Sequence, residues 1–211
     1  MNNNAKFIVF EGIDGAGKST QIQLLAKNLS ERGIKTHVSA EPTKYPSGLA
    51  IREVLSGRVK VTDDQLAVMF ANDRANHNTN TEDGIETLLN AGICPISDRY
   101  YYSSLAYQGV QIGLPRVMEL NLDNPDIRRP DLCIFLDLEP QQSLERINAR
   151  HVSTEIFETY EYLDKTRKTF INVIDLLREG GENIVCINAA GSVEEISESV
   201  LFAVLKLWEN Q

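Results

Sequence analysis

A glycine-rich segment with one lysine and one serine lies near the start of the chain, as GIDGAGKST over residues 12–20. An apolar run precedes it and a segment with helical spacing follows, which is the context that makes a GxxxxGKS pattern specific. The glycines let backbone N–H groups turn toward phosphate oxygens, and the helix start adds its positive dipole end. Lys18 would bind the outer phosphates, and Ser19 would offer its hydroxyl to Mg²⁺. We therefore expect a nucleoside triphosphate to contact Gly12, Ile13, Asp14, Gly15, Ala16, Gly17, Lys18, Ser19 and Thr20.

A second polar group follows a later apolar run, as SDRYYYSSLAYQG over residues 97–109. Asp98 stands at a strand end, where a carboxylate could hold Mg²⁺, usually through water. Arg99 could bind a phosphate through two parallel hydrogen bonds. By itself such a dipeptide is more often a local ion pair. The tyrosines, serines and glutamine that follow favour a pocket for a sugar or a base.

The elements that must position these groups alternate along the chain. Strands alternating with helices predict a parallel sheet that is covered on both faces. Ligands bind such a sheet at the carboxyl ends of its strands. Functional residues are therefore expected just after residues 11, 40, 97, 137 and 188. Apolar, β-branched runs predict strands near residues 6–11, 35–40, 93–97, 131–137 and 183–188. The clearest helical spacing of apolar residues predicts helices at 159–179 and 193–208.

Composition limits the classes of protein to consider. The 211 residues, with 42% hydrophobic and 24% charged side chains, predict a single domain over residues 1–211. The net charge of −9 argues against nucleic acid as a partner, because phosphate backbones bind broad basic surfaces. No run approaches the ~20 apolar residues of a membrane span, and no signal peptide is evident, so we expect a cytoplasmic protein. Cys94, Cys133 and Cys186 lack CxxC partners and are expected to be small buried strand residues.

Six segments, in this order and spacing, resemble those of thymidylate kinases, the P-loop kinases that phosphorylate dTMP with ATP. They span essentially the whole chain: FEGIDGAGKST, EPTKYPSGLAIREVL, MFANDRANH, DRYYYSSLAYQG, PDLCIFLDLEP and INAAGSVEEI. The resemblance implies a three-layer α/β P-loop NTPase fold, with a five-stranded parallel sheet flanked by helices. It implies transfer of the γ-phosphoryl group of ATP to dTMP, with Mg²⁺ as cofactor, and a homodimer.

The resemblance also implies which residues bind the acceptor. Phe70 would stack on thymine, and Arg74 would hydrogen-bond the pyrimidine O4. A spacing of four residues places both on one helix face, although spacing alone would favour a core phenylalanine and a solvated arginine. Arg99 would hold the acceptor phosphate, and Tyr107 would crowd the 2′ position of the sugar. Other acceptor contacts are expected from Asp14, on the sugar, and from Ser103, Ser104 and Gln108.

The chain departs from the family pattern after its second strand. It reads AEPTKYPSG, with Ala40 where bacterial relatives have an arginine and Lys44 where other members have one. We expect Lys44 to replace that arginine as a catalytic cation that also contacts the acceptor. A lysine neutralises charge but lacks the planar two-point contact of a guanidinium. A surface lysine in a turn is the alternative.

A second departure concerns the segment that closes over ATP, the lid, which we place near residues 147–160. The P-loop contains no arginine, and family members of this kind usually carry catalytic arginines in the lid. Arg150 is expected to be the catalytic lid residue and Arg146 a further ATP contact, although Arg146 has a structural alternative. A lone histidine, His151, is expected to be a solvated surface residue. The late INAAGSVEEI would pack its backbone against adenine.

Two other functions stay open at this point. One is a different nucleotide or deoxynucleoside kinase, although two cations on the acceptor side favour a monophosphate acceptor. The other is a nucleotide-dependent switch ATPase, which would leave the pocket of Phe70, Arg74 and Tyr107 without a role. The preference for dTMP over dUMP is also open, because many apolar side chains could contact a methyl group.

Overall fold

The computed structural model describes residues 5–149 and 159–209 of the chain. Five strands form one fully parallel sheet in the order β2-β3-β1-β4-β5. Their bounds fall within or beside the five predicted apolar runs, so the predicted α/β class and sheet are confirmed. The strands are β1 (Ile8–Glu11), β2 (Thr36–Ala40), β3 (Cys94–Asp98), β4 (Leu132–Asp137) and β5 (Ile184–Asn188).

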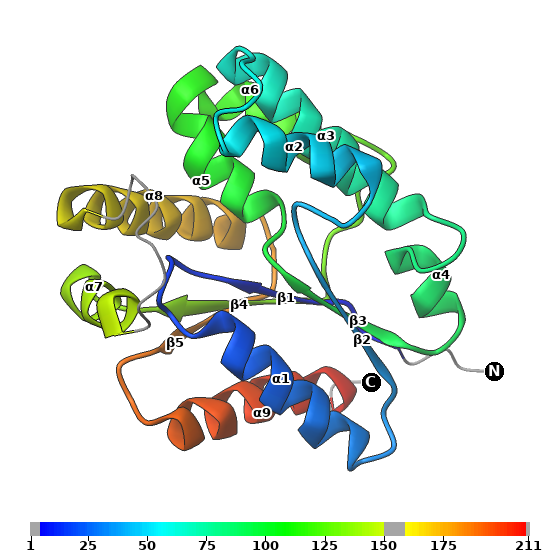
Figure 1. Cartoon of the computed structure of the whole chain (residues 1–211). Coiled ribbons are helices and arrows are strands. Elements are labelled where there is room, and N and C mark those ends of the chain that lie inside the picture. Colours follow the sequence, from blue (N-terminus) through cyan, green and yellow to red (C-terminus); the bar gives the residue numbers. More distant parts are fainter. Residues whose placement is uncertain (1–4, 150–158, 210–211) are drawn as a thin grey trace.

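Helices cover both faces of the sheet and make three layers (Figure 1). Alternate residues of β1 point to opposite faces, as the twofold period of a strand requires. Ile8 and Phe10 pack with α1 (Lys18–Ser30) and α9 (Val193–Glu209), whereas Val9 packs with α5 (Tyr101–Ile112) and α8 (Tyr160–Glu179). The remaining helices are α2 (Pro46–Leu55), α3 (Asp63–Thr79), α4 (Ile85–Asn90), α6 (Leu114–Leu122) and α7 (Pro140–Ala149).

Local sequence signals explain where the helices near the site begin. Thr62 and Gln65 form a capping box at the start of α3, because each side chain bonds the other's backbone N–H. Pro46 occupies the first turn of α2, where its missing N–H costs nothing. The capping box sets where α3 begins, and α3 carries Phe70 and Arg74.

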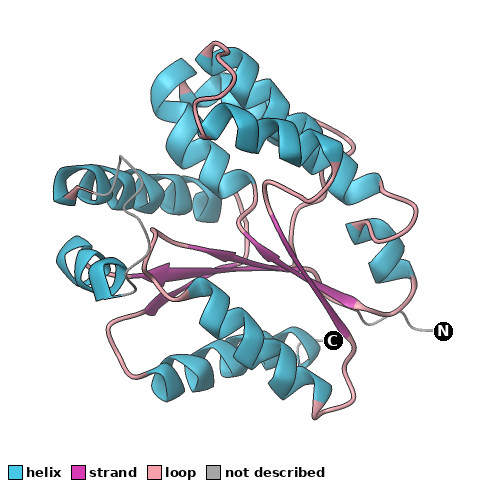
Figure 2. Cartoon of the chain, in the orientation of Figure 1, coloured by secondary structure: helices cyan, strands magenta, loops and turns pink. Residues whose placement is uncertain are grey.

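The parallel arrangement gathers three chain segments at one edge of the sheet. The Glu41 N–H donates to the Asp98 carbonyl at 3.0 Å, and the Arg99 N–H donates to the Phe10 carbonyl at 2.9 Å. The loops that follow β1, β2 and β3 therefore start side by side. Figure 2 shows how these loops connect strands to helices at this edge. The edge is the one at which the sequence predicts functional residues.

Two of the three cysteines are buried as predicted, and the third is not. Cys94 and Cys133 are buried, whereas Cys186 is exposed. The prediction for Cys186 is wrong because β5 is an edge strand, and no other strand of the described residues lies beyond it. Its sulfur accepts a hydrogen bond of 3.3 Å from Arg178.

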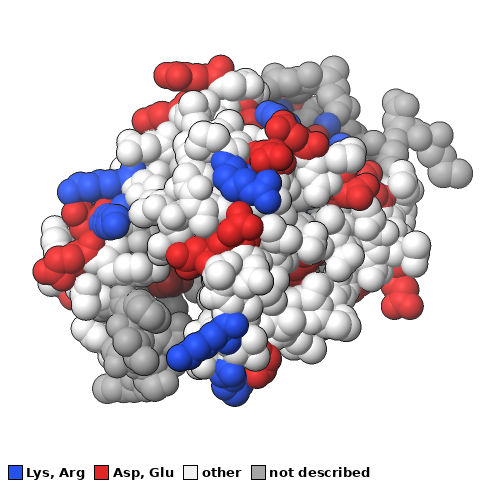
Figure 3. All heavy atoms as spheres, turned by 90° about the horizontal axis from the view of Figure 1, so that it is seen from above, with Lys and Arg blue, Asp and Glu red and all other residues white. Residues whose placement is uncertain are grey.

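Charge on the surface is mixed. On the face shown in Figure 3, lysines and arginines are interspersed with aspartates and glutamates. A nucleic acid would need a broad basic surface, and this face does not provide one. The expected absence of a nucleic-acid partner stays a prediction. Within the described residues, no helix is long and apolar enough to cross a membrane.

Candidate active site

The P-loop is a tight turn between β1 and α1. Gly17 ends it with φ of 92°, and a Cβ on Gly12 would lie 2.6 Å from the Leu136 carbonyl. These two positions therefore need glycine. The buried Lys18 points back into the loop and donates to the carbonyls of Gly12 and Ile13 at 3.0 and 3.3 Å. Its ammonium thus stands at the centre of the turn, where phosphate oxygens would replace the carbonyls.

The loop is also anchored by α7, the helix that follows β4. The Ser143 hydroxyl, on the first turns of α7, donates to the Asp14 carbonyl. Gly15 faces the same serine, since a Cβ there would lie 2.8 Å from the Ser143 carbonyl. No sequence motif marks Ser143, and only its position in the fold reveals the contact.

The electrostatics of the loop lower the basicity of its lysine. Burial and the nearby Arg99 charge lower the pKa of Lys18 from 10.5 to about 8, although Asp98, Asp14 and Glu11 oppose them. A charged ammonium in a dry pocket is disfavoured unless a counter-charge is present. A triphosphate would supply that counter-charge, so binding of the nucleotide and protonation of Lys18 are coupled.

This coupling predicts a pH dependence. Lys18 carries its proton below its pKa of about 8 and loses it above, so the affinity of the free protein for ATP should fall as pH rises through that value. Isothermal titration with ATP between about pH 7.5 and 9.5 checks this. Lys18→Arg keeps its charge and should give a flat profile, even at lower affinity. A wild-type affinity that stays constant over the range contradicts the prediction.

Asp98 and Ser19 meet beside the loop. The Ser19 hydroxyl donates to Asp98 Oδ2 at 3.2 Å. The other carboxylate oxygen, Oδ1, is buried and has no hydrogen-bond partner among the described residues. A buried carboxylate oxygen of this kind needs a partner. Hydroxyl and carboxylate oxygens are the ligands that Mg²⁺ prefers, and it commonly completes its shell with water and substrate phosphates. These two residues therefore fit the cation.

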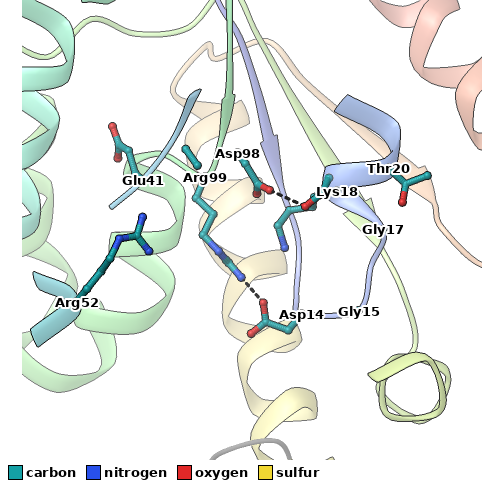
Figure 4. Close-up of a pocket in the computed structure, with 11 residues that line it drawn as sticks. Asp14, Gly15, Gly17, Lys18, Thr20, Glu41, Arg52, Asp98 and Arg99 are labelled. Carbon is teal, nitrogen blue, oxygen red and sulfur yellow. Dashed lines mark hydrogen bonds and ion pairs between the residues drawn. The ribbon is translucent and has the colours of Figure 1, made fainter. Parts of the chain in front are cut away.

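Arg99 occupies a central position next to the P-loop (Figure 4). Its guanidinium donates to Asp14 Oδ1 at 2.6 Å and to Ser103 Oγ at 3.1 Å. Burial disfavours the charge, but Tyr107 and the carboxylates of Asp14 and Glu11 outweigh it and raise the pKa of Arg99. Its backbone has φ of 73°, a region that non-glycine residues seldom adopt. Such conformations concentrate at functional sites.

Two cavities share these residues. The first, of about 490 Å³, is lined by the P-loop, Asp98 and the ends of β2 and β3. The second, of about 710 Å³, lies between α2, α3, α5 and α8. Asp14, Glu41, Arg52 and Arg99 line both cavities, so the cavities meet at these four side chains. Of the predicted acceptor residues, the second cavity collects Asp14, Phe70, Arg74, Arg99, Ser103, Ser104, Tyr107 and Gln108.

Arg74 is held rigidly in the wall of the second cavity. It forms a buried ion pair of 2.7 Å with Glu41 and donates to the side chains of Asn121 and Ser104. Glu41 also accepts from His77 at 2.9 Å. A guanidinium has five N–H groups, and this network leaves at least one of them for a ligand. The sequence predicted Arg74 but not Glu41 or Asn121, which lie 33 and 47 residues away.

The tyrosine cluster is divided between cavity and core. Tyr107 lines the second cavity and lies against Arg99, and burial raises the pKa of its phenol. Tyr101 and Tyr102 instead donate from their hydroxyls to Glu182 at 2.8 and 2.5 Å. Both are fully buried, and neither lines a described cavity. The expectation of a pocket formed by the whole cluster is therefore too broad, because successive helical residues point in different directions.

Lys44 does not line either described cavity, whereas Arg52, to which the sequence assigned no role, lines both. Lys44 is exposed on the turn before α2 and, within residues 5–149 and 159–209, lines neither cavity. Arg52 lies one turn from the end of α2, donates to the Pro42 carbonyl and points toward Arg99 (Figure 4). The turn itself is fixed by Asp73, which accepts from the Thr43 N–H at 2.8 Å. Arg52 carries no functional signal in the sequence, because Arg-Glu within a helix resembles an ordinary surface pair.

The predicted lid can be followed only at its start. Arg146 on α7 donates to the Ala189 carbonyl at 2.8 Å, which joins it to the loop after β5 that the sequence expects beside adenine. Its contact with ATP stays a prediction. Arg150 and His151 lie outside the described residues.

A phosphate loop at the carboxyl edge of a parallel sheet, with a second arginine-lined cavity that meets it, defines a P-loop kinase for a small phosphorylated acceptor. Comparison with known families agrees, since the thymidylate kinase family model matches residues 10–200. This chain belongs to the thymidylate kinase family, whose members use ATP to phosphorylate dTMP. The family and activity predicted from the sequence are thereby confirmed.

Individual relatives cover nearly the whole chain. A probable thymidylate kinase of Methanococcus aeolicus is 40% identical over 199 residues, which cover 93% of this chain and 94% of the relative. One of Thermococcus gammatolerans is 36% identical over 203 residues, covering 92% and 93%. A thymidylate kinase of Leptospira interrogans is 36% identical over 186 residues, covering 86% and 89%.

Proposed function

We propose that this chain transfers the γ-phosphoryl group of ATP to the 5′-phosphate of dTMP, giving dTDP and ADP. The meeting of the two cavities at Asp14, Glu41, Arg52 and Arg99 carries the proposal. A donor phosphate in the first cavity and an acceptor phosphate in the second would face each other there. Two anionic groups must approach in this reaction, so positioning and charge neutralisation provide the catalysis.

Each cavity contributes its own set of contacts. In the first, the P-loop N–H groups and Lys18 bind the donor phosphates. In the second, Phe70 stacks on the thymine and Arg74 offers its remaining N–H to the pyrimidine O4. Asp14 and Tyr107 lie where the sugar passes between base and phosphate. Further acceptor contacts come from Ser103, Ser104 and Gln108, which line the same wall.

Mg²⁺ completes the donor side of the proposal. Ser19 and Asp98 would hold it, the latter through the buried oxygen that has no hydrogen-bond partner among the described residues. When bound, the cation supplies positive charge that screens the triphosphate. Lys18 and Arg99 provide the protein's own charges around the reacting phosphates.

The direct test is an acceptor panel. The protein is incubated with ATP, Mg²⁺ and one candidate acceptor at a time: dTMP, dUMP, dCMP, thymidine or AMP. We expect ADP to form with dTMP and not with thymidine. Turnover of thymidine but not dTMP would favour a nucleoside kinase, and ADP formation without any acceptor would favour a switch ATPase. The dUMP reaction settles a preference that the sequence leaves open.

We also propose that Arg52, and not Lys44, is the second cation at the acceptor phosphate. Arg52→Ala should lower kcat/KM for dTMP by about thirtyfold or more, because a charged contact to phosphate is lost. Lys44→Ala is the matched control, because Lys44 lies on the turn before the same helix. Its kcat/KM for dTMP should stay within about twofold of wild type. Steady-state kinetics of both variants decide between them. A loss in Lys44→Ala with a silent Arg52→Ala would restore the assignment made from sequence.

Three further features stay predictions from the sequence. They are the homodimer, the cytoplasmic location and the single domain over residues 1–211 with its lid near 147–160. The catalytic role of Arg150 belongs with them.

A further inference from the structure

A buried glutamate adjoins the site without a role in the proposed reaction. Glu11 is the last residue of β1 and is fully buried. Its Oε1 accepts from the N–H groups of Tyr100 and Ser103 at 2.8 and 3.1 Å. Its Oε2 accepts from the Ser103 hydroxyl at 2.7 Å. It lines neither cavity described here, so it touches no expected substrate atom.

These hydrogen bonds place Glu11 at the start of α5 as a cap supplied by another element. Tyr100 is the N-cap residue of α5 and provides no side-chain cap of its own. The first N–H groups of a helix lack partners within the helix and favour a negative charge nearby. The carboxylate of Glu11, 89 residues away in sequence, satisfies two of them. It therefore fixes where α5 begins.

The residue directly before that cap is Arg99. Its backbone has φ of 73°, which persists only where surrounding contacts hold it. The Ser103 hydroxyl donates to Glu11 and accepts from Arg99 Nη1 at 3.1 Å. Glu11 thus acts on Arg99 twice, through the backbone at the helix start and through the serine hydroxyl. Burial raises the pKa of Glu11, and the charge of Arg99 is the largest effect that opposes this rise.

We propose that Glu11 is a positioning residue that holds Arg99 in place for the acceptor phosphate. The inference rests on the proposed function, since it assigns Arg99 to the phosphate of dTMP. Its consequence is specific. Loss of the hydrogen bonds that Glu11 accepts should weaken the binding of acceptors that carry a phosphate and leave the binding of the nucleoside part unchanged.

Glu11→Gln tests this with little change in shape. The amide oxygen can still accept from both backbone N–H groups, but the amide nitrogen cannot accept from the Ser103 hydroxyl. Titration calorimetry compares three ligands: dTMP, thymidine and ATP. We expect dTMP affinity to fall about tenfold, with thymidine and ATP within about twofold of wild type. Unchanged dTMP affinity, or an equal loss for thymidine, overturns the proposal.

Glu182→Gln is the matched control for general damage to α5. Glu182 is also buried, with a side chain 5% exposed, and it accepts from Tyr101 and Tyr102 of the same helix. Glu182 precedes β5 and therefore lies at the amino-terminal ends of the parallel strands, whereas Arg99 lies at their carboxyl ends. In this variant, any change in affinity relative to wild type should be the same for dTMP and for thymidine. The same selective loss here would mean that any disturbance of α5 produces it, which also overturns the proposal.

A third variant covers the case in which Glu11→Gln does not fold. Ser103→Ala removes the hydroxyl that joins Glu11 to Arg99. Because this hydroxyl also lines the acceptor cavity, only a loss that spares thymidine supports the positioning role, and we expect dTMP affinity to fall by about threefold to fivefold. No loss in this variant contradicts the proposal. Failure of the proposed function looks different: wild-type protein would then form no ADP with dTMP. If only the positioning role is wrong, wild-type protein still turns over dTMP, and the variants show no selective loss of dTMP affinity.

Discussion

Lys18→Ala is expected to reduce turnover of dTMP by about a hundredfold or more, because removal of one charge at the transferring phosphate costs about 3 kcal/mol of transition-state stabilisation. The fold should survive. The partners of the Lys18 ammonium are two loop carbonyls, of Gly12 and Ile13, and no core side chain depends on it. Steady-state kinetics give the loss, and thermal unfolding reports the fold.

The same variant has a second readout that separates binding from folding. ATP should raise the melting temperature of the wild type, since a ligand that binds only the native state stabilises it. Lys18→Ala should keep the melting temperature of the ligand-free protein and lose most of the ATP-dependent increase. A variant that unfolds without ligand, or one that retains near-normal turnover, would remove Lys18 from the phosphate site.

Arg99→Ala is expected to have the second large effect, a fall in kcat/KM for dTMP of about a hundredfold or more. The guanidinium contacts both Asp14 and Ser103, at 2.6 and 3.1 Å, and stands where the two cavities meet. Arg99→Lys should recover only part of this loss, because an ammonium lacks the planar fork that bonds two oxygens at once. The ATP affinity of both variants should change far less.

An exposed arginine provides the control for this prediction. Arg58 pairs with Glu53 at the surface beyond α2, with most of its side chain in solvent. Arg58→Ala should leave kcat/KM for dTMP within about twofold of wild type, as surface pairs contribute little. If Arg99→Lys were fully active, the two-point contact would not be needed, and Arg99 would act as a simple counter-charge.

The ion pair between Arg99 and Asp14 shows how the site is prepared. Partial burial alone would raise the pKa of Asp14, but the charges of Arg99 and Lys18 outweigh it and lower that pKa. The aspartate therefore stays ionised at neutral pH and holds the guanidinium beside the P-loop. An acceptor phosphate would compete for the same N–H groups. Arg99 can bind either the Asp14 carboxylate or the acceptor phosphate, because its hydrogen bond to Ser103 keeps the guanidinium oriented.

Much of this protein could be predicted from the sequence, because its signals are local. The P-loop follows from glycine, lysine and serine within one turn between a strand and a helix, where each residue acts on its immediate neighbours. The capping box of Thr62 and Gln65 also joins residues three apart. Continuous apolar, β-branched runs marked the strands, since strands of a parallel sheet that is covered on both faces are hydrophobic at nearly every position. These local signals predicted the α/β fold and the phosphate loop, and the resemblance to a known family added the acceptor residues Phe70, Arg74 and Tyr107.

Contacts between residues far apart in the sequence were determined by the tertiary structure alone. Glu11 caps a helix 89 residues away, and Arg74 bonds Asn121 across 47 residues. Whether Lys44 or Arg52 reaches the cavity depends on the turn that Asp73 fixes from α3. Cys186 is exposed on a strand that lies at one end of the order β2-β3-β1-β4-β5. Each of these contacts is set by which strands become neighbours, and local propensities carry no information about that order.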